Sequence, residues 1–398
     1  MTAGQGAYGP LLPEEREAGV SLVRQGFGSP RDQIERAIDL FGPQVLRGLR
    51  GAGGTLVGHA AVWPVDQWFG GRPVPAQGVA AVAVDPAERG RGHGTSLIRA
   101  VLDEARADGA ALSILYPATL SLYAKAGYGR AGVSVDWSAP PTVLTTAQPP
   151  QDGTITRADP QDATPLAALR HSLLTIGNGL LERNEALWSF ALCPFGELSD
   201  LYRLNGPNGP EGYIAVAPPK QRSLAVADYC VLSRRAARLA LSFLAGYRAQ
   251  VDRVRWRGGP DDPLALLAAE TGARVDAREE WLLRVVDIEG ALGSRGYPRD
   301  VVADLGLDVT DPLFAANSGR FRLRVSGGWG TVARVDPADK LTESGGLSLG
   351  IAALATLYSG HNDAALLRQV GLLAGDDDSV ATAMRLFAGP SPWMPDRF

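Results

Sequence analysis

A glycine-rich stretch, VDPAERGRGHGTSLI at residues 84–98, has the composition of a phosphate-binding loop. Three glycines alternate there with Arg91 and His93, after an apolar strand-like segment and before a segment with helical spacing. Small residues allow the backbone N–H groups at a helix N-terminus to approach a phosphate, and the helix dipole favours the negative charge. The stretch therefore predicts a site for a phosphate-bearing ligand.

Three phosphate-binding patterns can be compared with this loop. A Walker A loop, G-x-x-x-x-G-K-[ST], needs a lysine that the loop lacks. The dinucleotide fingerprint G-x-G-x-x-G needs another spacing, because Gly90, Gly92 and Gly94 follow G-x-G-x-G. The pattern R-x-x-G-x-G fits fully, with Arg89 as its arginine. Since Arg89 would add a charge-assisted contact, the loop indicates a pyrophosphate site.

The elements expected around the loop alternate between strand and helix. Segments rich in valine and alanine predict strands at 55–65 and 78–84, with turn signals between them. Apolar residues at helical spacing predict a helix over 95–108. The next expected elements are a strand at 111–116, a short helix at 119–127 and a strand at 131–137. This order is typical of an α/β domain with a mixed or antiparallel sheet.

A second domain is expected beyond residues 138–152, where four prolines in fifteen residues predict a linker. Its predicted elements are strands at 212–217, 223–232 and 251–258, and an amphipathic helix at 233–250 capped by Ser233. The segment CVLSRRAARLAL stands where the glycine loop would be. This domain is therefore not expected to bind phosphate. A third domain is expected to begin near Leu282.

Composition limits the class of protein. The chain has 398 residues, is 45% hydrophobic and 21% charged, and carries a formal net charge of −4. Its length predicts two or three domains, and its mild acidity gives no basic footprint for nucleic acid. No signal peptide is visible, and the longest apolar run, at 347–358, is too short to span a bilayer. We therefore expect a cytoplasmic protein without membrane or nucleic-acid partners.

Residues for metal or nucleophilic chemistry are sparse. His59, His171 and His361 show no metal-ligand spacing, so no metal is expected. The segment GLSLG at 346–350 matches the nucleophile elbow G-x-S-x-G, which would make Ser348 a hydrolase nucleophile. However, the residues before it are polar where a buried strand is required, and no acidic residue lies between Ser348 and His361. The sequence does not favour a hydrolase.

Residues 79–130 resemble the acetyl-CoA-binding core of the GNAT (GCN5-related N-acetyltransferase) superfamily, whose phosphate loop is Q/R-x-x-G-x-G/A. The motif LYAKAGYGRAG after the loop extends this resemblance. Segments further on are similar to the C-terminal region of the Eis (enhanced intracellular survival) family: LLRVVDIEGALGSRGY, NSGRFRL, LATLYSG and LFAGPSPWMPDRF. The resemblance covers nearly the whole chain.

The resemblance implies a fold of class α+β or α/β. Tandem GNAT folds, each a mixed, mostly antiparallel sheet with flanking helices, would precede a sterol-carrier-protein-like α+β domain. The expected domains are a catalytic GNAT domain at 1–140, a degenerate GNAT-like domain at 141–284 and the third domain at 285–398. The resemblance also implies an acetyl-CoA-dependent N-acetyltransferase that assembles as a homo-oligomer, namely a hexamer.

In GNAT enzymes the acetyl thioester lies between two splayed strands, and a backbone N–H polarises its carbonyl. The resemblance therefore implies backbone contacts from Val82, Ala83 and Val84. The loop residues that it implies for acetyl-CoA binding are Arg89, Gly90, Arg91, Gly92, His93, Gly94 and Thr95. For His93, the sequence favours a solvent-facing loop position over a phosphate contact.

Two residues are implied as catalytic. Tyr123 lies on the short helix where the family's general acid is found. A phenol with a pKa of about 10 can, with modest assistance, protonate a departing thiolate whose thiol has a pKa of about 8.5. Phe398 matters for its terminal carboxylate, which the family uses as the base that accepts the proton of the substrate amine. Tyr128, five residues after Tyr123, is expected to be structural.

The acceptor site is the least defined part of the sequence. The candidate substrate-binding residues are Asp396 and Phe27, which lies in an early helical segment and could equally be a core residue. Arg397 stands where an acidic residue would favour polycationic aminoglycosides. The acceptor could be an aminoglycoside, a peptide lysine, a polyamine or a dedicated natural-product amine. A non-catalytic CoA- or lipid-binding scaffold or sensor is the alternative.

Overall fold

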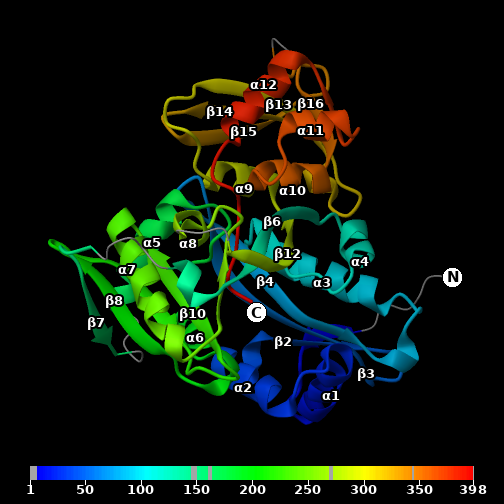
Figure 1. The fold of residues 1–398 in the computed structure, drawn as a ribbon. Helices are drawn as coiled ribbons and strands as arrows, with labels where there is room; N and C mark the ends of the chain where they lie inside the picture. Colours follow the sequence, from blue (N-terminus) through cyan, green and yellow to red (C-terminus); the bar gives the residue numbers. More distant parts are fainter. Residues whose placement is uncertain (1–6, 145–149, 160–163, 269–271, 343–344, 398) are drawn as a thin grey trace. The chain divides into compact units, whose positions relative to one another are not determined.

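The structure is a computed structural model that describes residues 7–144, 150–159, 164–268, 272–342 and 345–397. The chain forms two compact units (Figure 1). Unit 1 contains the residues up to Gly132 together with Glu280–Pro390, and unit 2 contains Val133–Glu279 together with Ser391–Arg397. The tail of the described chain therefore packs with unit 2, whereas the segment just before it packs with unit 1.

The N-terminal part of unit 1 is built on a mixed sheet. Its spatial order is β1 (Ala7–Pro10), β2 (Leu46–Arg50), β3 (Leu56–Phe69), β4 (Arg72–Val84), β5 (Leu112–Leu115) and β12 (Arg274–Val285). β4 and β5 are parallel, and the other neighbouring pairs in this order are antiparallel. The expectation of a mixed, mostly antiparallel sheet is confirmed.

Helices cover both faces of this sheet. They are α1 (Arg16–Phe27), α2 (Arg31–Phe41), α3 (His93–Ala107) and α4 (Leu120–Lys125) (Figure 1). Neighbouring strand residues point to opposite faces. Leu56 packs in a cluster with Leu22 of α1, whereas Val57 packs in a cluster with Leu97 of α3. Because both faces are covered, β3 is buried along most of its length and does not alternate.

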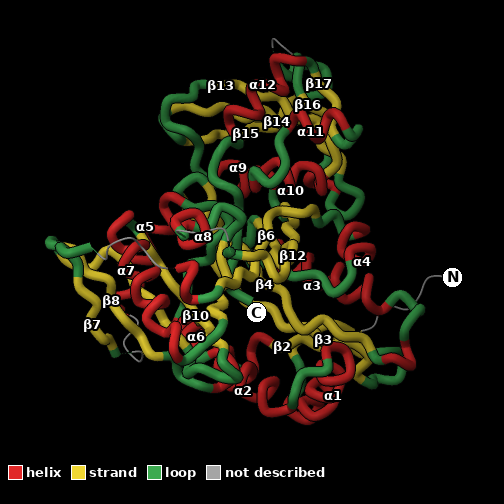
Figure 2. The backbone as a smooth tube through the Cα atoms, in the orientation of Figure 1, coloured by secondary structure: helices red, strands yellow, loops and turns green. Residues whose placement is uncertain are grey.

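β3 and β4 form one long hairpin (Figure 2), which corrects the broad turn expected between the first two strands. Gly70 and Gly71 form its tip, with φ angles of 59° and 78°. Pro73 and Pro75 lie within β4, although proline signals usually argue against a strand. β4 tolerates them because its pairing with β5 begins at Ala76, so their missing N–H groups leave no gap in that ladder.

The C-terminal part of unit 1 is a further α+β fold. Its sheet has the order β15 (Trp329–Val335), β14 (Gly319–Ser326), β13 (Ala303–Thr310), β16 (Leu347–Gly350) and β17 (Leu373–Gly375). Its helices are α9 (Ile288–Ser294), α10 (Ile351–Ser359), α11 (Ala364–Gln369) and α12 (Asp377–Leu386). Gly296, which follows α9, donates its N–H to the carbonyl oxygen of Phe69 at 3.0 Å. The tip of the β3–β4 hairpin thus joins the two parts of unit 1.

Ser348 lies inside β16 and is not on a turn. It stands opposite Asp308 of β13 and opposite Ala374 of β17. A nucleophile elbow places its serine on a sharp turn between a strand and a helix. The G-x-S-x-G match therefore lacks the geometry of a hydrolase.

Unit 2 repeats part of the topology of the first domain. Its strands have the order β6 (Gly129–Ala139), β11 (Arg253–Gly258), β10 (Ser223–Val231), β9 (Gly209–Val216), β8 (Asp200–Gly206) and β7 (Thr154–Ala158). Its helices are α5 (Thr164–Ile176), α6 (Glu185–Leu192), α7 (Arg234–Ala245) and α8 (Pro263–Leu267). Ser233 caps α7 as predicted, since its Oγ accepts from the N–H of Ala236 at 3.0 Å. Parallel β10 and β11 flank α7 in the chain as β4 and β5 flank α3.

The segment predicted as a linker is partly folded. β6 continues to Ala139, and a 3-10 turn follows at Pro141–Leu144. Leu144 is buried in the core that also contains Leu239 of α7. An apolar side chain in this segment therefore anchors it, while residues 145–149 lie outside the described residues. The domain limit expected after residue 140 falls just beyond β6, and the limit expected after residue 284 falls within β12. Both strands have residues in each unit, and the two limits stay a prediction.

The contact between Gly70 and Gly296 predicts a stability effect. A Cβ atom at Gly296 would lie 1.9 Å from the carbonyl oxygen of Gly70, so Gly296→Ala must displace the hairpin tip. We expect a loss of about 1–3 kcal/mol and a lower midpoint of thermal unfolding, measured by circular dichroism. Gly293→Ala on α9 is the matched control, because no atom lies within 4 Å of its Cβ position and alanine favours a helix. Equal midpoints for the two variants would contradict this interpretation.

Candidate active site

The end of β4 departs from regular pairing. The register with β3 shifts between Ala80 and Ala83, so that Ala81 and Val82 oppose a single residue as a bulge. Ala81 has a φ of 50°, in the left-handed region that costs a non-glycine residue about 1–2 kcal/mol. A bulge bends its strand and turns the backbone groups that follow.

β4 and β5 separate before this bulge. Their parallel pairing covers Ala76, Gln77 and Gly78. Beyond Gly78, β4 pairs with β3 alone, while β5 pairs with β12 on its other side. The backbone of Val82–Val84, the segment expected to contact a thioester, therefore has one side that no neighbouring strand occupies. This is the splayed geometry that the resemblance implies.

The glycine loop leaves the N-terminus of α3 open. Gly90 and Gly92 have φ angles of 79° and 85°, which glycine adopts without strain. No atom lies within 4 Å of a Cβ placed on either residue. Gly92 is the N-cap residue of α3, and no side chain caps the helix there. The first N–H groups of α3 are thus available to an anion, where the helix dipole is positive.

The side chains of the loop lie around one carboxylate. Glu88 accepts from the guanidinium of Arg91 at 2.8 Å and lies 3.4 Å from Nε2 of His93. His93 is half-buried against this carboxylate, whereas Arg89 and Thr95 are exposed. Arg89 is therefore placed to meet a ligand from solvent, and Glu88 holds the other two side chains beside the loop.

Tyr123 is a buried phenol on α4. It is 4% exposed, and its ring packs edge to face on that of Tyr128 at 5.7 Å between centroids. Burial raises the pKa of Tyr123 to about 12, so the phenol stays protonated at neutral pH. Its hydroxyl has no hydrogen-bond partner among the described residues, whereas the hydroxyl of Tyr128 bonds Oγ of Ser113 at 2.7 Å. Tyr128 is thus satisfied within the core, whereas the Tyr123 hydroxyl is unpaired among the described residues.

The predicted segments meet at the start of α3. A Cβ at Gly94 would lie 3.6 Å from Leu122, the neighbour of Tyr123, and 3.8 Å from Val84 at the end of β4. Tyr123 also shares one apolar cluster with Val79 of β4, and Val82 packs against that cluster. The fold therefore brings together the loop, the open strand end and the phenol.

Phe27 lies at the end of α1, close to the same strand. A Cβ at Gly26 would lie 3.4 Å from Cβ of Ala83, so the last turn of α1 rests on β4. Phe27 is 46% exposed. An aromatic side chain that is exposed beside an open strand end suits a wall of a ligand pocket.

Asp396 is enclosed in a charged cluster of unit 2. Arg170 Nη2 donates to its Oδ2 at 2.9 Å, and Arg183 Nε donates to its Oδ1 at 2.6 Å. Arg183 also binds Asp228 with two hydrogen bonds, and the hydroxyl of Tyr213 donates to Asp228 at 2.7 Å. Burial alone would raise the pKa of Asp228, but the guanidinium of Arg183 holds it below its ordinary value. The cluster pairs two arginines with two aspartates inside the protein.

This cluster changes the interpretation of the tail. Both carboxylate oxygens of Asp396 are bound by arginines, and the carboxylate is 2% exposed. The expected base, Phe398, lies outside the described residues. Sequence reasoning missed Arg170 and Arg183, because 226 and 213 positions separate them from Asp396 and no local pattern links them.

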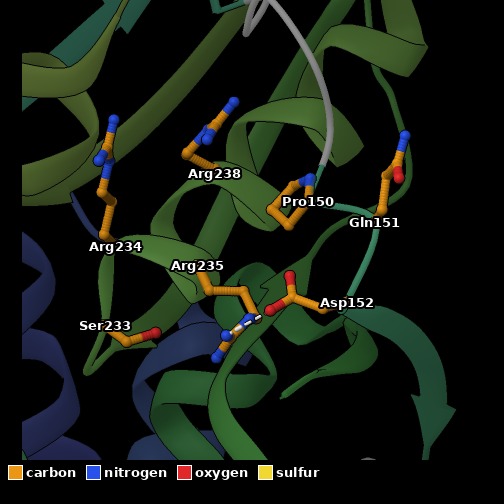
Figure 3. A pocket seen from close by; sticks show the side chains of 7 residues that line it. All are labelled: Pro150, Gln151, Asp152, Ser233, Arg234, Arg235 and Arg238. Carbon is orange, nitrogen blue, oxygen red and sulfur yellow. Dashed lines mark hydrogen bonds and ion pairs between the residues drawn. The ribbon is translucent and has the colours of Figure 1, made fainter. Parts of the chain in front are cut away.

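Unit 2 has an arginine-lined pocket at the start of α7, the position in its topology that corresponds to the glycine loop before α3 in unit 1. Figure 3 shows this pocket of about 510 Å³, lined by Pro150, Gln151, Asp152, Ser233, Arg234, Arg235 and Arg238. Arg235 binds Asp152 and Glu211, each at 2.5 Å. No glycine stands in the turn before α7. The open helix start of the first domain is therefore not repeated here.

Comparisons with known proteins agree with this fold. Family models for the acetyltransferase (GNAT) domain match residues 8–131 and 179–285, and a sterol carrier protein domain model matches 288–395. An uncharacterised N-acetyltransferase of Streptomyces avermitilis is 29% identical over 83% of this chain and 82% of its own. One from Streptomyces griseus is 28% identical over 98% of both chains.

Solved structures lead to the same family. A GCN5-related N-acetyltransferase from Anabaena variabilis is 31% identical, with a TM-score of 0.92 over 98% of this chain and 100% of that one. The chain therefore belongs to the GCN5-related N-acetyltransferase family and is an acyltransferase. Its fold is Eis-like: Eis1 from Mycobacterium abscessus has a TM-score of 0.79 at 24% identity, over 98% of this chain and 100% of its own.

Among the described residues, no helix has both the length and the apolar character needed to cross a membrane. Among the same residues, no group of three or more histidine, cysteine and carboxylate side chains is placed to hold a metal ion.

Breaking the Asp396 cluster should destabilise the protein. Asp396→Asn removes one of two buried negative charges and leaves Arg170 undercompensated, so we expect a loss of about 3–5 kcal/mol in chemical unfolding. Asp252→Asn is the matched control, because Asp252 binds Arg222 at 2.6 Å on the surface, where ion pairs contribute little. The interpretation is wrong if both substitutions shift the unfolding midpoint equally.

Proposed function

We propose that the protein transfers an acetyl group from acetyl-CoA to a primary amine by direct attack within a ternary complex. The meeting of three segments at the start of α3 is the observation that carries this proposal: the open glycine loop, the unpaired side of β4 and the Tyr123 phenol. GNAT acetyltransferases in general use acetyl-CoA, which supplies the activated acetyl thioester.

On the donor side, the residues fit a CoA pyrophosphate. The N–H groups from Gly90 to Thr95 and the positive end of α3 would bind the phosphates, and Arg89 would add a charge-assisted contact. Arg91 and His93 share Glu88, so they would shape the loop and contact phosphate less directly. The backbone of Val82–Val84 would hold the thioester and polarise its carbonyl, because an N–H aimed at a developing oxyanion stabilises it.

Tyr123 is proposed as the general acid. Its pKa of about 12 keeps the phenol protonated through the whole neutral range, so the proton is present when the C–S bond breaks. The hydroxyl is committed to no other group among the described residues. The proton would move from the phenol oxygen to the CoA sulfur, which leaves as a neutral thiol.

The terminal carboxylate of Phe398 is proposed as the base. A lysine-like amine with a pKa of about 10.4 is about 0.1% neutral at pH 7.4, which corresponds to roughly 4 kcal/mol. A carboxylate beside the nitrogen would offset part of this by accepting the proton. Asp396, the candidate substrate ligand two residues earlier, is now proposed to act as an anchor of the tail, because arginines bind both of its oxygens.

The acceptor class is proposed from the same site. Phe27 would form a wall of the amine pocket, and lysine side chains, polyamines, aminoglycosides and natural-product amines all have the required primary amine. Assembly into a homo-oligomer, a hexamer by the family resemblance, belongs to the same proposal, and analytical ultracentrifugation tests it.

Thiol release tests the reaction. With acetyl-CoA and a panel of aminoglycosides, polyamines and lysine peptides, we expect release with at least one amine. Tyr123→Phe should lower kcat by about 100-fold, because it removes the proton donor. Tyr128→Phe is the control, since that hydroxyl is bonded to Ser113. Adding a glycine after Phe398 should also reduce kcat, whereas Phe398→Ala keeps the carboxylate in place.

The outcomes separate the parts of this proposal. Binding of acetyl-CoA without release for any amine would favour a sensor or a specialised acyltransferase. Full activity of Tyr123→Phe would remove the assigned acid, and full activity of the glycine-extended chain would remove the assigned base.

The glycine loop can be tested through affinity. Gly92→Ala places a side chain on a φ of 85° at the start of α3, and Gly109→Ala does so on a φ of 80° beyond its end. Both positions have open space around the Cβ, so the two variants bear similar strain. We expect Gly92→Ala to weaken acetyl-CoA binding by about tenfold or more in calorimetry, because the loop can no longer approach the phosphate. Equal affinity of the two variants would contradict the loop assignment.

A further inference from the structure

His59 is a buried ionisable residue that the proposed reaction does not use. It lies near the start of β3, between Gly48 of β2 and Ala83 of β4, and is 3% exposed. Its Nδ1 lies 3.1 Å from the carbonyl oxygen of Ala81, the residue with the left-handed φ in the bulge of β4. The side chain of His59 thus reaches from β3 to the bulge of the neighbouring strand, β4.

The bulge explains why this carbonyl needs a donor. Ala81 and Val82 have no partner residue in the register of β3 and β4. A carbonyl that the ladder does not pair needs another donor where water is largely shut out, and this part-buried carbonyl has the ring of His59 beside it. A carbonyl oxygen can only accept, so Nδ1 of His59 must carry the proton. The bulge is therefore closed by a side chain in place of a backbone N–H.

The surroundings favour this neutral tautomer. Burial lowers the pKa of His59, and the hydrogen bond with the Ala81 carbonyl opposes this shift. The other edge of the ring faces α1, where a Cβ at Gly19 would lie 3.2 Å from Cδ2 and 3.7 Å from Nε2. The absence of a side chain at Gly19 makes room for the imidazole. Both edges of the ring are thus fixed, one by a hydrogen bond and one by packing.

We propose that His59 is a positioning residue, which holds the β4 bulge so that the backbone of Val82–Val84 faces the acetyl thioester. A one-residue slip in a strand pair reverses the direction of every following backbone and side-chain group. Without this donor, Ala81 would be free to leave its left-handed conformation. The pairing of β4 with β3 would then become regular. The proposal rests on the proposed function, because that segment is assigned to the donor thioester there.

Three substitutions separate the hydrogen bond from packing. Asparagine places its amide nitrogen at the position of Nδ1, so His59→Asn retains the donor. Leucine has nearly the same shape as asparagine without a polar atom, so His59→Leu removes the donor at equal volume. Glutamine carries its amide one bond further, near the position of Nε2, so His59→Gln retains the polarity in the wrong place.

The experiment measures kcat and the KM for acetyl-CoA of these variants, with thermal unfolding as the control for folding. We expect His59→Leu and His59→Gln to lose kcat by about tenfold or more, as when a backbone donor is moved away from an oxyanion. Their KM for acetyl-CoA should change by less, because the phosphate loop is untouched. His59→Asn should recover most of kcat. If folded His59→Leu and His59→Asn have equal kcat, the positioning role is overturned.

Two readouts do not depend on activity. Nitrogen NMR of the histidine rings should show His59 as the neutral tautomer protonated at Nδ1, and protonation at Nε2 alone would overturn the proposal. Amide hydrogen exchange of the segment from Ala81 to Val84 should be faster in His59→Leu than in His59→Asn, and equal exchange would overturn it as well. If the wild-type protein releases no thiol with any amine, the proposed function fails, while these two readouts still test the role of His59 in the bulge.

Discussion

The backbone hydrogen bonding of β4 is the constraint on which the site depends. On one side the strand pairs with β3, and on the other its pairing with β5 ends at Gly78. Every polar backbone group beyond that point must find another partner or face a ligand. The bulge at Ala81 changes the direction of these groups, and α3 and α4 place their own ends beside the same opening. The open glycine loop and the Tyr123 phenol can form one site because the strand end between them is unpaired.

The second domain shows how the same topology can carry different chemistry. β10, α7 and β11 follow the order of β4, α3 and β5, with the same parallel pairing. In the first domain, glycines leave the helix start open. In the second, Ser233 caps the helix, and Arg235 is held by two carboxylates. A fold fixes where a helix begins, and the residues at that point decide what it binds.

Buried charge organises the rest of the chain in both units. In unit 2, Arg170 and Arg183 bind Asp396 of the tail, so the tail is fixed by ion pairs that are shielded from water. In unit 1, Arg284 binds Asp311 with both side chains fully buried, beside the Gly127 turn that follows α4. Removing one partner of such a pair leaves a buried charge without compensation. These pairs therefore fix segments that have little regular secondary structure.

The sequence by itself determined the glycine loop, the order of strands and helices around it, the cap of α7 and the family, because these depend on spacing within short segments. It did not determine the bulge, since VAAVAV at 79–84 contains no turn residue, nor the strand through Pro73 and Pro75, which depends on where the pairing of β4 with β5 begins. It also suggested Asp396 as a substrate-binding residue and gave no sign of the two distant arginines that bind its carboxylate in the structure. The tertiary structure decided these features, because each depends on a hydrogen bond or an ion pair between residues far apart in the chain.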